Sequence, residues 1–162
     1  MNPQKKFKKI YDKNVESIYR FVFLKVSKKE TAEDLTSETF KKGWEVFKEN
    51  PNMDNPRAYL YKIARNGVID HYRTKKQHLS PDDLQLEDDH KNIQEIASQN
   101  QQVEKIKEAM KSLKDNYQDI IIYRYLEELE ISEIAQILDK SEGAVRVTIH
   151  RATEALKKEI DK

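Results

Sequence analysis

The 162-residue chain contains no cysteine, only three glycines and four prolines, and no apolar run near the ~20 residues that a membrane-spanning helix needs. Without cysteine there is no disulfide and no thiolate metal site. Seven glycines and prolines are too few for folds built of many short strands, or for a glycine-rich phosphate loop. The first residues lack the apolar segment of a signal peptide. These absences predict an all-α, soluble protein of the cytoplasm.

The charge is nearly balanced over the whole chain but not along it. The 30 Lys+Arg and 29 Asp+Glu residues leave a formal net charge of +1. Residues 1–76 carry 18 basic and 10 acidic side chains, residues 77–110 carry 3 and 8, and residues 111–162 carry 9 and 11, so the net charges are +8, −5 and −2. This asymmetry predicts a polyanion-binding face in the N-terminal part.

An acidic segment separates two parts that have helical periodicity. Residues 82–89 contain five acids, follow a basic run and show no sustained apolar period. Because like charge and low apolar content leave little burial to offset the entropy of ordering, we expect this segment to be flexible. The sequence therefore predicts two small helical domains, residues 1–76 and 104–162, joined by an acidic linker over residues 77–103.

The first part contains three predicted helices, at about residues 5–26, 30–48 and 56–76. Apolar residues recur at three- and four-residue steps in the first two, and Pro56 suits the first turn of the third. On the third helix an apolar side is set against a polar strip, which consists of Tyr59, Lys62, Asn66, Asp70 and Arg73. Such a strip is compatible with a solvated face or with contact to nucleic acid.

The second part ends in a helix-turn-helix pattern. Helices are predicted around Val103–Leu113 and from Asp115, the latter with Leu126 among its apolar residues. Between Ile131 and Ala152 a short helix and a longer one, capped by Ser141, place apolar residues inward, which are Ile134, Ala135, Leu138, Val145, Ile149 and Ala152. The same spacing would suit a plain αα-hairpin, so the residues alone leave DNA binding open.

Three segments together, residues 32–40, 55–73 and 131–152, resemble bacterial RNA polymerase sigma factors of the extracytoplasmic-function (ECF) type. The resemblance covers both predicted domains in order and leaves only the linker without a motif. It implies an alternative sigma factor that binds core RNA polymerase, directs it to specific promoters and helps to open the minus-ten element, often in a stress response. The implied partners are the polymerase beta-prime clamp and beta flap, promoter DNA and an anti-sigma factor, in some cases membrane-anchored.

The resemblance also implies roles for individual residues. Polymerase binding falls on Asp34, Leu35 and Glu38 of the second helix. Contact with the minus-ten element falls on Asn55, Tyr59, Lys62, Arg65, Asn66, Arg73, Lys75 and Lys76, with the loop over residues 48–55 as the wall of a pocket for an extruded base. Contact with the minus-thirty-five element falls on Ser141, Glu142, Gly143, Ala144, Arg146, Val147, His150 and Arg151.

The helix-turn-helix departs from the family pattern at three positions. Asp139 stands where the turn commonly has glycine, Ala144 replaces a frequent threonine, and Thr148 lies where a cation is frequent. Asp tolerates left-handed backbone geometry, so we expect the turn to form. Losing two phosphate contacts predicts weak DNA binding by this domain alone.

An enzyme is a poor alternative, because the four histidines lack metal-ligand spacing and no serine has a recognisable base beside it. No cofactor, metal or small-molecule substrate is therefore expected. The main competing hypothesis is a stand-alone helix-turn-helix regulator that binds an operator.

Overall fold

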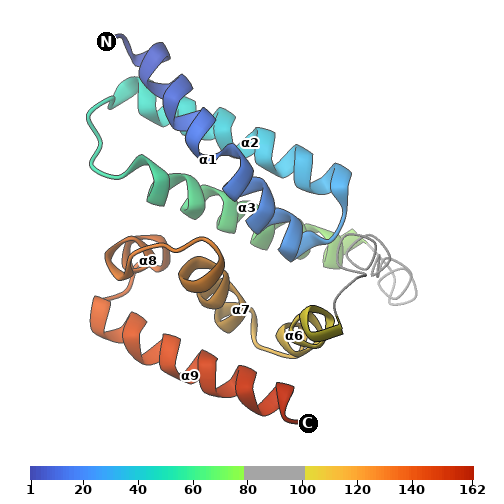
Figure 1. Ribbon diagram of the computed structural model, residues 1–162. Helices are drawn as coiled ribbons and strands as arrows, with labels where there is room; N and C mark the ends of the chain where they lie inside the picture. Colours follow the sequence, from blue (N-terminus) through green and yellow to red (C-terminus); the bar gives the residue numbers. More distant parts are fainter. Residues whose placement is uncertain (79–100) are drawn as a thin grey trace. The chain divides into compact units, whose positions relative to one another are not determined.

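The computed structural model describes residues 1–78 and 101–162, and every regular element within these ranges is a helix (Figure 1). The chain divides into two compact units, Met1–Asn92 and Ile93–Lys162. The predicted all-α fold with two helical units is confirmed. Most of the predicted acidic linker lies outside the described residues. Among the helices that are described, none has the length and apolar character to cross a membrane.

The first unit consists of three helices, α1 (Pro3–Val26), α2 (Lys29–Glu49) and α3 (Pro56–His78), which all pack against one another (Figure 1). Each lies within two residues of its predicted bounds. Asn2 caps α1, since its Oδ1 accepts a hydrogen bond from Lys5 N at 2.8 Å, and Pro3 occupies the first turn. The helix ends where Ser27 adopts a left-handed φ of 63°.

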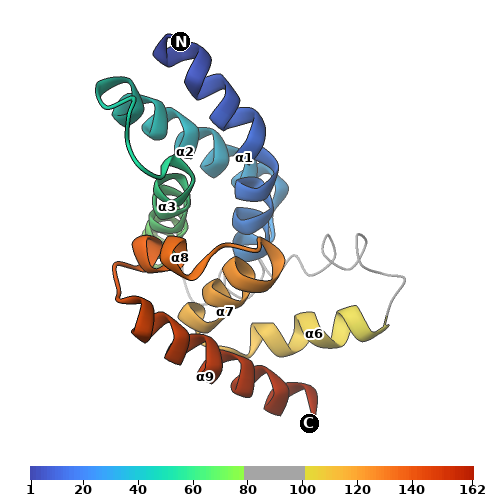
Figure 2. The ribbon, with the colours of Figure 1, turned by 60° about the vertical axis from the view of Figure 1, so that its left-hand side comes forward.

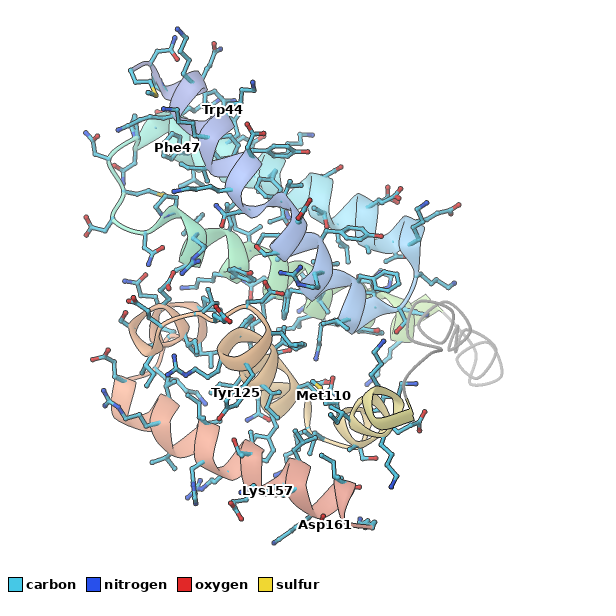
Figure 3. All side chains as sticks on the ribbon, viewed as in Figure 1. Trp44, Phe47, Met110, Tyr125, Lys157 and Asp161 are labelled. Atoms are coloured by element: carbon cyan, nitrogen blue, oxygen red, sulfur yellow. The ribbon has the colours of Figure 1, made fainter. Side chains whose placement is uncertain are left out.

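The core of the first unit combines aliphatic residues with an aromatic cluster. Ile18, Phe21 and Ala64 are fully buried. At the end of the unit that carries the N-terminus, Phe7 of α1 contacts Trp44 and Phe47 of α2, with ring centroids 5.4 and 5.5 Å apart, and Figure 3 labels these two α2 side chains. This packing agrees with the amphipathic pattern of all three helices and fixes which faces remain at the surface.

The second unit contains α6 (Gln101–Lys111), α7 (Asp115–Ile121), the π-helix η1 (Ile122–Leu126), α8 (Ile131–Leu138) and α9 (Glu142–Ile160). Helices α6, α7 and α8 all pack against α9 (Figure 2).

The π-helix changes which residues reach the core of the second unit. The sequence predicts Leu126 on the apolar side of the helix that starts at Asp115, but Leu126 is 50% exposed. Glu127 N bonds to Ile122 O at 2.9 Å, a five-residue step that widens the turn and rotates the residues after it. Glu128 then adopts a φ of 54°, and Leu129 is buried in place of Leu126.

Helices α8 and α9 form the predicted helix-turn-helix. Helix α8 begins with a reciprocal capping box between Glu130 and Glu133, in which Glu130 N donates to Glu133 Oε1 at 3.2 Å. Its inward side differs from the prediction by one residue, because Ile137 is buried and Leu138 only half-buried. Asp139 has φ 54° and ψ 50°, so the left-handed turn expected there is present.

Candidate nucleic-acid interface

The polar strip of α3 is a surface feature of the first unit. Tyr59 is 36% exposed, and Lys62, Asn66, Asp70 and Arg73 are exposed with it. Arg73 Nη2 lies 2.9 Å from Asp70 Oδ1, which lowers the net charge that the strip offers to phosphate. What remains is an aromatic ring, an amide and an ammonium group on one helix face, a combination that suits stacking, base-edge and phosphate contacts.

Of the other residues predicted for minus-ten contact, one directly precedes α3 and three lie elsewhere on the helix. Asn55 Oδ1 accepts a hydrogen bond from Ala58 N at 3.1 Å, so this side chain caps the helix. An Asn directly before Pro56 is a recognisable helix-start signal, and the capping role could have been predicted from it. Arg65 is half-buried, and Lys76 is exposed. Lys75 is half-buried and lines a cavity between α2 and α3.

The loop between α2 and α3 is attached to the first helix. Lys6 Nζ lies 3.3 Å from Asn52 Oδ1 and 3.4 Å from Pro51 O. These partners stand 45 and 46 residues from Lys6 in the chain, so no local pattern in the sequence signals the contact.

Helix α9 presents its predicted contact residues to solvent. Ser141, Glu142, Gly143 and Ala144 of the first turn are exposed, and so are Arg146, Val147, His150 and Arg151. Ser141 Oγ accepts from Ala144 N at 3.1 Å, which confirms the predicted cap. Thr148 Oγ1 donates to Ala144 O at 2.9 Å, so its hydroxyl is directed at its own helix. Val145 and Ala152 are completely buried on the opposite side.

Helix α2 carries the residues predicted for polymerase binding. Asp34 and Glu38 are exposed, and Leu35 is half-buried beside Gly67 of α3, where a Cβ would lie 3.8 Å from Leu35 Cδ2. The helix therefore offers two carboxylates and part of an apolar side chain on its outer surface, a pattern suited to contact with another helix.

A cavity of about 570 Å³ lies between α2 and α3. Lys28, His71 and Lys75 line it, together with Leu35 and Glu38. Burial, the Lys75 charge and the Lys28 charge lower the pKa of His71, in that order of importance. Burial and the Lys28 charge likewise lower the pKa of Lys75. The sequence shows His71 and Lys75 four residues apart, but only the packing of α2 on α3 brings Lys28 to them.

Within the part of the chain that the structure describes, no group of three or more His, Cys, Asp and Glu side chains could hold a metal ion.

Both halves of the chain match models of known protein families. Residues 10–78 match the family model of Sigma-70 region 2, and residues 103–156 match that of Sigma-70 region 4. The α2 and α3 surfaces described above lie within the first range, and the α9 surface lies within the second. The chain therefore contains, in order, two regions of a transcription initiation factor of the sigma-70 class.

Relatives define the group within that class. ECF RNA polymerase sigma factor SigM of Bacillus subtilis is 30% identical over 149 residues, which are 91% of this chain and 91% of SigM. ECF RNA polymerase sigma factor BldN of Streptomyces coelicolor is 30% identical over 156 residues; the match covers 93% of this chain but only 58% of BldN. The solved structure of the sigma factor RpoE from Bartonella quintana, in complex with the anti-sigma factor NepR, has a TM-score of 0.73 at 19% identity and covers 97% of this chain and 98% of RpoE, which supports the fold.

The chain belongs to the ECF family of RNA polymerase sigma factors. It is accordingly an alternative sigma factor that directs RNA polymerase to promoters, and the stand-alone regulator is not favoured.

Proposed function

We propose that residues 1–76 dock on the polymerase clamp and open the minus-ten element, that residues 104–162 bind the minus-thirty-five element and the beta flap, and that residues 77–103 connect them. The observation that carries the proposal is the exposure of Tyr59, Lys62 and Asn66 on one face of α3, within the segment that matches Sigma-70 region 2.

The α3 strip has the chemistry needed to hold an unpaired base. The Asn66 amide offers both a donor and an acceptor to a base edge, Tyr59 offers a stacking face, and Lys62 offers a charge to the adjacent phosphate. Base stacking on an aromatic side chain is worth about 1–3 kcal/mol per base, enough for a few extruded bases to offset lost pairing. On this account opening requires no nucleotide hydrolysis, and the chain acts without a catalytic residue or a cofactor.

Helix α9 has the form of a recognition helix. Its first turn and the outward residues Arg146, His150 and Arg151 stand on the side opposite the buried Val145 and Ala152, so the helix could enter a major groove without losing its core contacts. Residues 111–162 carry a net charge of −2, and Thr148 faces its own helix. We therefore expect this unit to bind promoter DNA weakly until core polymerase supplies the second attachment.

Further partners follow from the relatives. RpoE of Bartonella quintana is solved with the anti-sigma factor NepR, and we infer that an anti-sigma factor, in some cases membrane-anchored in this family, restrains this chain too. A factor that serves core polymerase and promoter DNA would act in the cytoplasm.

Paired substitutions separate the two proposed surfaces. Arg146→Ala should reduce promoter-specific run-off transcription about tenfold while leaving capture of core polymerase unchanged, because it removes a contact to DNA only. Asp34→Ala should reduce capture of core polymerase first. The matched controls are Lys157→Ala on α9 and Glu45→Ala on α2, each an exposed charge outside the proposed contacts. If Arg146→Ala and Asp34→Ala lose both activities together while remaining folded, the division of roles is wrong.

A further inference from the structure

We propose that the cavity between α2 and α3 is a binding site for a small phosphate-bearing anion, whose phosphate lies among Lys28, His71 and Lys75. Nothing in the sigma-factor role requires a small ligand at this place.

The cavity has the size and the chemistry of a ligand site. Its volume of about 570 Å³ falls within the range of about 300–1,000 Å³ usual for small-molecule pockets. Lys28 comes from the start of α2, whereas His71 and Lys75 lie one turn apart near the end of α3. The three basic groups therefore meet at one end of the cavity, and Thr31 and Thr74 line the same space.

The remainder of the lining suits the body of a small molecule better than a nucleic acid. Leu35, Ile63 and Gly67 supply an apolar surface. Glu38 and Asp70 place two carboxylates beside it, and Lys42 adds one further cation. The two carboxylates oppose a polyanionic backbone that would run along the whole cavity, whereas a small anion can place its phosphate among Lys28, His71 and Lys75 and extend along the apolar lining. Counted at 100° per residue, Lys75 also falls roughly opposite the Tyr59, Lys62 and Asn66 strip on α3, away from the proposed DNA face.

Like charges held together weaken a folded protein unless an anion compensates them. Burial, then the Lys75 and Lys28 charges, lower the pKa of His71, and burial and the Lys28 charge lower the pKa of Lys75, so the charged forms of both groups are disfavoured here. A phosphate with two negative charges would reverse that effect and favour the protonated form of His71. The cluster thus gains stability when the site is occupied.

An anion bound in the cavity would also affect the surface proposed to bind polymerase. Leu35 and Glu38 line the cavity and belong to that surface, so a ligand among them would compete with docking on core polymerase. This consequence rests on the proposed function, whereas the binding of the anion does not.

The test uses the full-length protein and inorganic pyrophosphate as the probe, at constant ionic strength. The imidazole Hε1 resonance of His71, assigned by comparison with His71→Gln, reports binding. We expect a saturable shift and a raised His71 pKa, with affinity reduced about tenfold in Lys75→Gln and in Lys28→Gln. Lys76→Gln is the matched control, because Lys76 is an exposed cation next to Lys75 and does not line the cavity. This variant should bind pyrophosphate as the unaltered protein does. The same response to sodium chloride, or an unchanged affinity in folded Lys75→Gln, would overturn the proposal.

A second arm identifies the source of the phosphate. If a promoter fork duplex shifts the His71 resonance in a Lys75-dependent manner while pyrophosphate does not, the site belongs to the DNA path and the small-molecule assignment is wrong. Capture of core polymerase is measured separately with and without pyrophosphate. If pyrophosphate binds but does not reduce the capture of core polymerase, the link to docking is wrong. If pyrophosphate does not bind, the site itself is wrong.

Discussion

Lys6 Nζ lies 3.3 Å from Asn52 Oδ1 and 3.4 Å from Pro51 O, so a side chain of the first helix holds the loop between the second and third helices. That loop is the proposed wall of the base pocket. Its position relative to the α3 strip therefore depends in part on a residue near the N-terminus of the chain.

Replacing Lys6 by methionine keeps most of the side-chain length but removes the donor. We expect faster amide exchange for residues 50–55, a loss of up to about 1 kcal/mol in unfolding free energy, and weaker discrimination among minus-ten sequences. Hydrogen exchange and run-off transcription on a set of minus-ten variants measure these effects. Lys9→Met, at an exposed position of the same helix, is the control. Unchanged exchange in the loop of Lys6→Met would show that the contact does not hold it.

The glycines at 43 and 143 should respond in opposite directions to alanine. A Cβ at Gly43 would lie 2.7 Å from Leu60 Cδ2, whose side chain is buried in the first unit, whereas a Cβ at Gly143 would meet nothing within 4 Å. Overpacking costs about 1–3 kcal/mol and better helix propensity returns at most about 1 kcal/mol, so Gly43→Ala should destabilise by about 1 kcal/mol.

Gly143→Ala should stabilise α9 by about 0.5 kcal/mol, because alanine fits the first turn of a helix better than glycine. Urea denaturation followed separately for each unit by hydrogen exchange checks both values. If the exposed first turn of α9 approaches DNA closely, the more stable Gly143→Ala protein should still show weaker transcription. Equal stability changes at the two glycines would contradict the described packing.

The left-handed turn of the helix-turn-helix gives a third prediction. Asp139 has φ 54°, and non-glycine residues pay a steric cost of about 1–2 kcal/mol there, less for Asp than for β-branched residues. Asp139→Gly should leave the second unit as stable or slightly more stable, and Asp139→Val should destabilise it by about 1 kcal/mol. Thermal unfolding of the two proteins, compared at equal concentration, measures the difference. A tolerated valine would mean that the turn has another backbone conformation.

The pH dependence of stability should contain a contribution from His71. Its pKa is lowered from 6.5 in the folded chain, so as the pH falls below about 6.5 the unfolded chain binds a proton that the folded chain does not. Unfolding free energy must then decrease with falling pH, until the pH has passed the folded pKa.

His71→Gln should remove this slope, and Lys75→Gln should reduce it by raising the His71 pKa toward 6.5. Chemical denaturation between pH 7.5 and 5.5 tests both, over a window chosen because carboxylates titrate mainly below it. Tyr72→Phe, which removes a hydroxyl that donates to Lys25 O at 2.5 Å and no titrating histidine, is the control. If the unfolding free energy of His71→Gln depends more steeply on pH than that of the unaltered protein, the folded chain binds the His71 proton more tightly than the unfolded chain, which contradicts the expected direction.

Much of the architecture could be predicted from the residues in order. The α1, α2 and α3 bounds followed from apolar steps of three and four and from Pro56, because a helix turns by a fixed angle per residue. The exposed faces of α3 and α9 followed from the same geometry. The left-handed Asp139 and the Ser141 cap followed from the local chemistry of those side chains.

What the sequence by itself determined is therefore local: which segments are helical, which side of each is apolar, and which family motifs they carry. The tertiary structure decided whatever depends on residues far apart in the chain. Packing of α2 on α3 brought Lys28 to His71 and Lys75. Packing of α1 beside the loop between α2 and α3 brought Lys6 to Asn52. The π-helix η1 exposed Leu126 and buried Leu129. Periodicity fixes the direction in which a side chain leaves its own helix, but only the packing of a second helix determines what that side chain meets.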